Sequence, residues 1–258
     1  MTRPSGLTLY AFVYLAFLYI PVLLLPLFSF NDGTIVAFPI KGWTFQWYRE
    51  LGGQEILIQA LGNSLFVGFV VSLLSTSMGL FAARAYVRYR FRGKGFSEGL
   101  VMLPLVVPGI IVASSMLVLF ISMGLKPSLT AVILGHTFLA LPFAVSIMKS
   151  AFDDFDASLE EAAFDLGSTV FETFRRVTLP IVAPGIVSSF LVTFTVSFDE
   201  FVLAFFLSGN QPTLPVYIWS QIRFPAKLPD TLALGSLLLL ASVLLLVVAE
   251  YFRRRSTK

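Results

Sequence analysis

The amino-acid sequence predicts an all-α membrane protein with six transmembrane helices. Three observations predict this fold class. The 258-residue chain is 57% apolar, only 13% of its residues are charged, and its mean hydropathy is +0.85. A soluble domain is about 45–50% apolar and about 25% charged, so this chain lacks the polar surface that a folded particle needs in water. A disordered chain is excluded as well, because disorder requires low hydrophobicity.

Each expected span is an apolar run of about 20 residues, the length that crosses a bilayer as a helix. The first run is longer than a signal-peptide core and no small-residue cleavage site follows it, so we expect a retained helix. Pro104 and the Pro108-Gly109 pair interrupt the third run and predict a kink. The six spans are expected at about residues 7–30, 61–83, 99–122, 128–148, 181–207 and 231–252, in one transmembrane domain of residues 1–258.

The long apolar run over residues 177–222 allows two interpretations, because only Asp199 and Glu200 interrupt it. Two spans would make the acidic pair a tight turn and would give seven helices in total. However, residues 208–215 are rich in Ser, Gly, Asn and Pro, and this turn-forming stretch would then lie within the membrane. We therefore expect one span over residues 181–207, followed by an outer segment.

The distribution of positive charge predicts the orientation. With the N-terminus inside, thirteen of the eighteen Lys and Arg residues lie in inner segments. Cytoplasmic loops are enriched in these residues, so we expect both termini in the cytoplasm. The positions of these charges matter more than the pI of about 9.2, so membrane lipid is an expected partner and nucleic acid is not. Trp43 and Trp47, in the first outer segment, are expected at the headgroup level, with ligand recognition as the alternative.

The residue inventory excludes several kinds of chemistry. The sequence contains no cysteine and one histidine, His136, so disulfides, thiolate zinc sites and multi-histidine metal sites are excluded. We interpret His136 as a hydrogen-bonded packing residue, with a proton relay as the alternative. The sequence contains no G-x-S-x-G elbow and no G-x-x-x-x-G-K-[ST] phosphate loop. We therefore expect no catalytic residue, no bound metal and no ATP site in this chain.

The most informative segment is the polar inner loop over residues 149–180. Ser158 and Thr169 are each followed three residues later by a glutamate, so two capping boxes are expected to open two short helices. Gly167 is expected to end the first helix, because glycine tolerates the left-handed conformation. Pro180 is expected to mark the start of the next span.

This helix–turn–helix suits docking into a groove of a partner protein. Small alanines would allow close approach, and four phenylalanines would supply apolar contacts. These are Phe155, Phe164, Phe171 and Phe174. A loop that packs only against its own helices is the alternative.

The same loop resembles the EAA loop of the membrane subunits of ABC importers. The family pattern is E-A-A-x3-G-x9-I-x-L-P, and the chain departs from it only at Val177, where isoleucine is usual. The matching residues are Glu161, Ala162, Ala163, Gly167, Leu179 and Pro180. The six-span layout also resembles the type I permease architecture of that family, so the resemblance covers nearly the whole chain.

The resemblance implies how such a subunit works. In this family the loop docks on a cytoplasmic ATPase subunit, and ATP-driven closure of two ATPases turns the membrane cavity from one side to the other. The six matching residues would then be the ATPase-coupling site. The implied partners are a second homologous permease subunit, two copies of the ATPase and an extracytoplasmic solute-binding protein. ATP and Mg would bind the ATPase, this chain would carry no cofactor, and the complex would lie in the bacterial inner membrane.

Asp199 and Glu200 are candidates for the substrate path, because an acid within an apolar span normally faces a partner or a water-filled path. Glu200 shares a helical face with Ser189, Thr193 and Ser197. We expect this stripe to line the path and Glu200 to point into it. The alternatives are that the small hydroxyls pack helices together and that the acids bind neighbouring helix ends. An adjacent strip comprises Ser188, Thr195 and Asp199.

Residues 197–209 resemble the second permease subunit of spermidine/putrescine importers. Acids beside aromatic rings would bind an organic cation through charge pairing and cation–π contact, so the resemblance implies a polyamine or related cation. The same machinery for an opine, amino-acid derivative, phosphonate or iron complex is the alternative. A proton-coupled secondary carrier is a further alternative, which the loop argues against.

Overall fold

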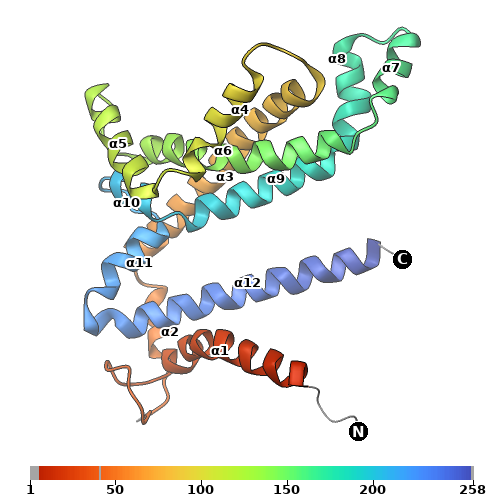
Figure 1. The fold of residues 1–258 in the computed structure, drawn as a ribbon. Coiled ribbons are helices and arrows are strands. Elements are labelled where there is room, and N and C mark those ends of the chain that lie inside the picture. The colour runs from red at the N-terminus through yellow and green to blue at the C-terminus, as the bar shows by residue number, and fades with distance from the viewer. Residues whose placement is uncertain (1–5, 41, 257–258) are drawn as a thin grey trace. The chain divides into compact units, whose positions relative to one another are not determined.

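The computed structural model describes residues 6–40 and 42–256, with side chains described up to residue 244. Over these residues the chain is helical, and its only extended pairing is an isolated bridge between Asn31 and Trp43. Five helices are long and apolar enough to cross a membrane, and a bent helix pair makes a sixth candidate (Figure 1). The predicted all-α membrane fold class is confirmed.

The helices have the following bounds: α1 Gly6–Ser29, α2 Gln46–Leu51, α3 Glu55–Arg88, α4 Lys94–Met102, η1 Leu103–Leu105, α5 Gly109–Ser122, α6 Leu129–Asp153, α7 Ser158–Asp165, α8 Val170–Thr173, η2 Phe174–Thr178, α9 Leu179–Asp199, α10 Val202–Leu207, α11 Leu214–Ile222, η3 Pro225–Lys227 and α12 Leu228–Ser256. The turns η1 and η3 are 3₁₀ helices and η2 is a π-helix. Helices α1, α3, α6 and α12 correspond to the first, second, fourth and sixth expected spans. The side chains of the sixth span beyond residue 244, and the Arg253–Arg255 cluster, lie outside the residues whose side chains are described.

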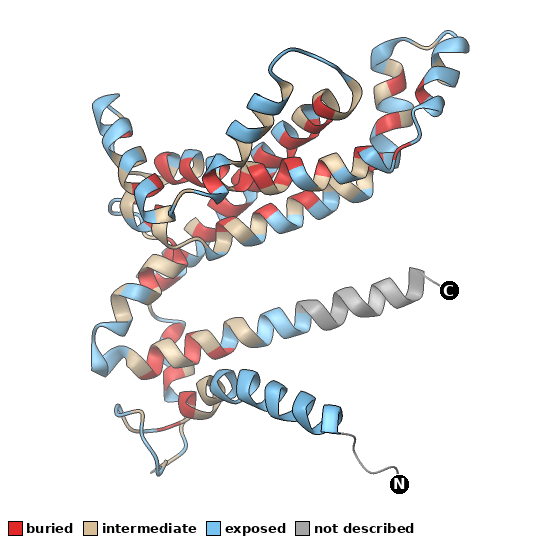
Figure 2. Cartoon of the chain, in the orientation of Figure 1, coloured by how far each residue is buried: buried red, intermediate tan, exposed pale blue. Residues whose placement is uncertain are grey.

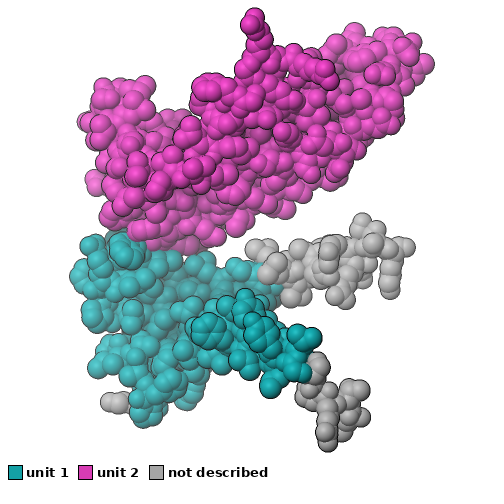
Figure 3. All heavy atoms as spheres, viewed as in Figure 1, with its two compact units in different colours: residues 1–58, 217–258 teal, residues 59–216 magenta. Residues whose placement is uncertain are grey.

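The chain folds as two compact units (Figure 3). The first unit combines the two ends of the chain, Met1–Ile58 and Tyr217–Lys258, and the second comprises Gln59–Val216. The loop over residues 149–180 and the acidic pair both belong to the second unit.

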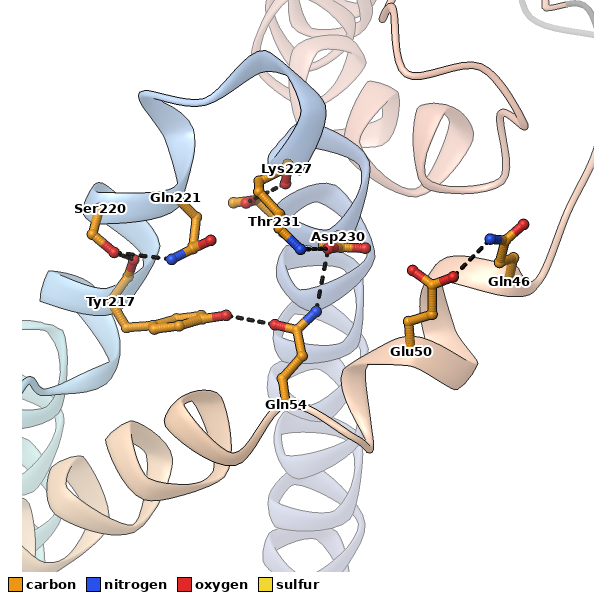
Figure 4. Close-up of polar contacts among 9 residues, drawn as sticks. All are labelled: Gln46, Glu50, Gln54, Tyr217, Ser220, Gln221, Lys227, Asp230 and Thr231. Atoms are coloured by element: carbon orange, nitrogen blue, oxygen red, sulfur yellow. Dashed lines mark hydrogen bonds and ion pairs between the residues drawn. The ribbon is translucent and has the colours of Figure 1, made fainter.

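A polar network connects the segments of the first unit (Figure 4). The hydroxyl of Tyr217 donates to the side-chain oxygen of Gln54, whose amide nitrogen donates to Asp230 at 3.2 Å. Lys227 lies 3.5 Å from the same carboxylate, which is buried. Burial and the nearby Asp230 carboxylate raise the pKa of Tyr217, so the phenol keeps the proton that it donates. The network fastens the start of α3 to α11 and α12.

Trp47 closes the segment between α1 and α2. It is buried, and its indole N–H donates to the carbonyl of Asn31 at 2.7 Å. Its polar atom therefore already has a protein partner, and its position at the headgroup level stays a prediction. Trp43 is 67% exposed and stays a candidate anchor.

The second unit is built on the contact of α6 with α3 and α9. Helices α6 and α9 lie side by side (Figure 1). A β-carbon added at Gly79 of α3 would lie 2.8 Å from that of Ala144, and one added at Gly185 of α9 would lie 2.5 Å from that of Ala151. Both distances are shorter than real β-carbon contacts, so these two glycines allow α3 and α9 to approach α6 closely. Small residues at such contacts are typical of helix packing in membranes.

The expected third span is broken rather than kinked. Helix α4 with η1 meets α5 at an angle of 102°. Val107 precedes a proline and is therefore disfavoured in the helical conformation, and Pro108 itself is extended with ψ of 129°. The helix restarts at Gly109, so the interruption expected at these prolines takes the form of a break between two helices.

The expected fifth span also ends early. Helix α9 stops at Asp199, and Glu200 is extended with ψ of 116°. The rest of the apolar run, residues 202–207, is the separate short helix α10, which packs on α5 and α6. Leu203 and Leu207 are buried there, so this apolar segment belongs to a protein core. The span 181–207 must therefore be corrected to end at residue 199.

The second helix of the loop continues into the membrane. Residues 170–199 form one uninterrupted helix, so Pro180 lies inside it and does not begin a new span. Proline has no N–H for the carbonyl four residues earlier and its ring would clash with that carbonyl. The wider π turn of η2, directly before Leu179, accommodates this ring.

We predict that Gly79→Ala destabilises the second unit. The added methyl would lie 2.8 Å from the Ala144 β-carbon and 2.9 Å from its carbonyl carbon, so the backbones of α3 and α6 must separate. Overpacking of this kind costs about 1–3 kcal/mol, and a fall in thermal midpoint in detergent measures it. The matched control is Gly62→Ala on the same helix, where a β-carbon meets nothing within 4 Å. Equal midpoints for the two variants would contradict the close-packing interpretation.

Candidate functional site

The loop over residues 149–180 projects from the α6/α9 pair as a hairpin of α7 and α8 (Figure 1). Gly167 has φ of 85°, the left-handed conformation that ends a helix. Its N–H donates to the carbonyl of Phe164 at 2.8 Å, and the N–H of Ser168 donates to that of Ala163 at 3.0 Å. This pair of bonds is a Schellman motif. The prediction that Gly167 ends the first helix of the loop is confirmed.

Only one of the two expected capping boxes forms. The Thr169 hydroxyl accepts from the N–H of Glu172, and the Glu172 carboxylate accepts from the N–H of Thr169, as predicted. Ser158 makes no capping bond, because α7 already begins there. Asp156 accepts its N–H instead, at 3.0 Å. Hydrogen bonds from Ser158 and the positive charge of Arg88 lower the pKa of Asp156.

The hairpin presents most of the expected coupling residues to its surface (Figure 2). Glu161, Ala162 and Gly167 are exposed, and Ala163 is half-buried. Leu179 and Pro180 lie on the exposed surface of α9, within the continuous helix and beyond the hairpin.

The expected apolar contacts divide into two groups. Phe171 is 70% exposed and Phe164 is 41% exposed, so both are available to a partner. Phe155 is buried, and Phe174 packs against the ring of Phe81. Leu166, which the sequence analysis did not single out, is 87% exposed at the hairpin turn and adds to the accessible group.

An ion cluster that the sequence analysis missed joins the hairpin to α3. Glu160 is only 8% exposed, although it precedes the exposed Glu161. Its carboxylate lies 3.4 Å from Arg84 and 3.5 Å from Arg88, and it accepts a hydrogen bond from the hydroxyl of Thr178. The three partners come from α3 and η2, so one carboxylate connects three elements.

Aromatic rings pack against both arginines of this cluster. The guanidinium of Arg84 lies 4.5 Å from the ring centre of Phe174, and that of Arg88 lies 4.8 Å from the ring centre of Phe155. Each arginine therefore contacts Glu160 and one ring of the loop. Removing one member of a buried ion pair costs about 3–5 kcal/mol, because the other charge stays buried without compensation.

The sequence did hold a signal for this cluster. Arg84 and Arg88 are four residues apart and therefore share one helical face. The sequence alone places both arginines among the thirteen Lys and Arg residues of the inner segments, and it indicates no role for Glu160 beside Glu161. A groove of about 470 Å³ opens beside the cluster, with Glu161 and Phe164 among its lining residues.

The polar stripe on α9 does not line an open surface. Ser189, Thr193 and Ser197 are all buried. The Ser189 hydroxyl lies 3.1 Å from that of Thr76 on α3, and Ser197 lies 2.9 Å from Nδ1 of His136 on α6. The burial of these three residues favours the alternative interpretation of helix packing, in which Ser189 bonds to Thr76, Ser197 bonds to His136, and Thr193 donates to the carbonyl of Ser189 on its own helix.

The two acids have different surroundings. The Glu200 carboxylate is half-buried and accepts the N–H of Leu203 at 3.0 Å, so it caps the start of α10. Asp199 is exposed and makes no hydrogen bond or ion pair with any residue that the structure describes. Ser188 and Thr195, on the same strip as Asp199, are exposed as well. The geometry therefore favours Asp199, and not Glu200, as the acid available to a ligand.

Comparison with known proteins identifies the family. Residues 75–258 match the family described as binding-protein-dependent transport system inner membrane component. The spermidine/putrescine transport system permease protein PotC of Haemophilus influenzae is 33% identical over 248 residues, which cover 96% of each chain. The putrescine transport system permease protein PotI of Escherichia coli is 33% identical over 250 residues, covering 94% of this chain and 88% of that one.

A solved structure shows the same fold. The crystal structure of a bacterial ABC transporter that imports the acidic polysaccharide alginate contains a chain that matches with a TM-score of 0.72 and 16% identity. The match covers 95% of this chain and 93% of that one. With the exposed hairpin that carries the EAA pattern, these matches establish that the chain belongs to the inner-membrane components of binding-protein-dependent transport systems, the permease subunits of ABC importers.

Proposed function

We propose that this permease forms half of the translocation path of an importer for spermidine, putrescine or a related organic cation. Permeases of ABC importers work with ATPase subunits and binding proteins. Here the complex comprises a second homologous permease, two copies of a cytoplasmic ATPase and an extracytoplasmic solute-binding protein. ATP and Mg²⁺ bind the ATPase subunits, and this chain has no enzymatic activity, in keeping with its lack of a phosphate-binding loop. Both termini lie in the cytoplasm, as the Lys and Arg bias predicts.

The hairpin is the docking element for the ATPase. Its exposed surface carries Glu161 and Ala162 beside the apolar side chains of Leu166 and Phe171. A short helix with a small-residue face and protruding apolar groups suits insertion into a groove. The continuous helix from Val170 to Asp199 carries displacement of this hairpin into the membrane.

The observation that supports the substrate class is the exposed carboxylate of Asp199. It lies at the end of a long apolar helix and makes no bond within the described residues. An acid facing lipid costs about 2.5–3.5 kcal/mol at the bilayer centre, so such a group faces a partner or an aqueous path. Phe198 stacks on Phe194 directly beside it, with ring centres 5.8 Å apart. A carboxylate beside aromatic rings favours a cation, and the relatives PotC and PotI are named for polyamine transport.

The direct test of substrate class is ligand binding by the cognate solute-binding protein. We expect spermidine and putrescine to raise its thermal midpoint. We also expect proteoliposomes that contain the whole complex to transport the same compounds only when ATP is present on the side of the membrane that carries the ATPase subunits. A response to sugars, oxyanions or iron complexes, without one to diamines, would exclude the polyamine assignment while leaving the permease role intact.

We predict that Glu161→Lys weakens ATPase docking by about tenfold, the effect of losing about 1.4 kcal/mol of binding. The side chain is exposed on the hairpin surface, so the change reverses a charge at the contact without disturbing the core. Co-purification of the ATPase with the tagged permease measures the effect. The matched control is Asp154→Lys, an exposed site at the end of α6 where a cation suits the helix terminus. Unchanged co-purification and uptake in Glu161→Lys would refute the docking surface.

Replacing Gly167 tests the hairpin turn. Gly167→Ala forces an alanine to φ of 85°, although a β-carbon there would meet nothing within 4 Å. The left-handed conformation costs about 1–2 kcal/mol for such a residue, so we expect faster amide exchange in α7 and weaker ATPase co-purification. Gly167→Asn should lie between alanine and glycine, because asparagine tolerates this conformation better. Identical amide exchange and co-purification in Gly167→Ala and Gly167→Asn would show that steric contact of the added side chain, and not backbone strain, causes the loss.

The two acids should respond differently to neutralisation. Asp199→Asn removes a free carboxylate, so we expect the KM for spermidine uptake to rise about tenfold or more, as for loss of a charge-assisted hydrogen bond. Glu200→Gln retains an oxygen that accepts the Leu203 N–H, so uptake should stay close to that of the unmodified protein. Proteoliposome uptake across a range of spermidine concentrations distinguishes them. A larger effect at Glu200 would restore the sequence-based choice of acid.

A further inference from the structure

We propose that Glu160 is a positioning residue that makes the α7–α8 hairpin and the neighbouring end of α3 move as one body, so that α3 carries ATPase movement to the segment after α10. This inference rests on the proposed docking of the hairpin on an ATPase. It assigns Glu160, the first acid of the Glu160-Glu161 pair, which the EAA pattern does not include, a role in energy coupling.

The first step is the opposite exposure of the two neighbouring acids. Successive residues of a helix point about 100° apart. Glu161 is exposed on the hairpin surface, whereas Glu160 turns inward and is 8% exposed. The pair therefore connects the surface available to a partner with the interior of the permease at two adjacent positions of α7.

The second step concerns the connections of the hairpin. The chain itself joins the hairpin to α6 at Asp153 and to α9 through η2. Helix α3 has no such chain connection to it. Among the described residues, the polar contacts between α3 and α7 are those of Arg84 and Arg88 with Glu160, and the two arginines also pack on rings of the loop. Glu160 is therefore the group through which α7 holds α3.

The third step is electrostatic. Two guanidinium groups share the single carboxylate of Glu160, and their side chains are only 14% and 16% exposed. Within the described part of the chain, Nε and Nη2 of Arg88 have no hydrogen-bond partner, so the Glu160 charge is what compensates them. Without that charge the two buried cations repel each other in a medium of low dielectric constant. Neutralising Glu160 should therefore loosen the connection of α3 to α7, while the apolar contact of Phe81 with Phe174 remains.

The fourth step is the other end of α3. The side-chain amide of Asn63 donates to the carbonyl of Pro212 at 2.9 Å, and the hydroxyl of Ser64 accepts the N–H of Leu214 at 2.8 Å. One rigid helix thus contacts the hairpin near Arg84 and the segment after α10 near Asn63. The twenty residues between these contacts span about 30 Å at 1.5 Å per residue. This segment follows the acidic pair in the chain, so α3 connects the docking surface with the proposed substrate region.

The experiment uses the complete transporter in proteoliposomes, with radiolabelled spermidine as the probe. Glu160→Gln should leave ATPase co-purification unchanged and should lower the spermidine moved per ATP hydrolysed by about fivefold or more, the lower range of coupling between sites. Glu160→Asp, which keeps the charge, should recover part of the coupling. Glu161→Gln is the matched control and should instead reduce co-purification of the ATPase.

A distance measurement tests the same proposal apart from transport. The chain has no cysteine, so Ser77→Cys on α3 and Ser158→Cys on α7 give two unique labelling sites, both exposed. We expect a single narrow spin-label distance in the nucleotide-free and ATP-trapped complexes, and a broadened distribution when Glu160→Gln is added.

The outcomes separate the two proposals. Failure of the unmodified permease to bind any ATPase would refute the proposed function. Normal ATPase binding together with unchanged coupling and an unchanged distance distribution in Glu160→Gln would refute the role of Glu160 alone. Loss of ATPase binding in Glu160→Gln to the level of Glu161→Gln would also refute it, because Glu160 would then act in docking.

Discussion

The close packing of α6 against α3 and α9 is the constraint on which the rest of the second unit depends. Helices in lipid gain little from the hydrophobic effect when they associate, so they rely on van der Waals contact and interhelical hydrogen bonds. Gly79 and Gly185 remove the side-chain volume that would separate the backbones. Because both helices lie close to α6, Ser189 of α9 also reaches Thr76 of α3. The two hydroxyls, which would be costly in lipid, thus form a hydrogen bond with each other.

The hairpin uses this packed group of helices as its base. Its second helix is covalently continuous with α9, and its first helix is connected to α3 through Glu160. The π turn of η2 accommodates Pro180 without breaking the helix, so the apolar helix α9 begins as part of the hairpin. A permease subunit that must convert movement of a partner into movement of its spans benefits from such stiff connections, because loosely attached loops would absorb the displacement.

Several local features were predictable because short-range chemistry determines them. The left-handed glycine at Gly167 and the reciprocal cap at Thr169 each depend on a few neighbouring residues, and both formed as expected. Ser158 failed as a cap because the helix begins at that residue, and a shift of one position is below what pattern analysis resolves. The broken third span was only partly predictable: its prolines indicated an interruption, but the residue pattern does not give the 102° angle between the two helices.

The sequence by itself determined the membrane class, the approximate number and position of the spans, and the loop whose residue pattern indicates the family, since hydropathy, charge bias and motif spacing are local properties. Only the tertiary structure decided that the stripe through Ser189 is buried, that Asp199 is the exposed acid, and that Glu160 connects the hairpin to α3. The physical reason is that a period of 3.6 residues shows which side chains share a helical face, whereas their energetic role depends on whether lipid, water or another helix lies opposite that face.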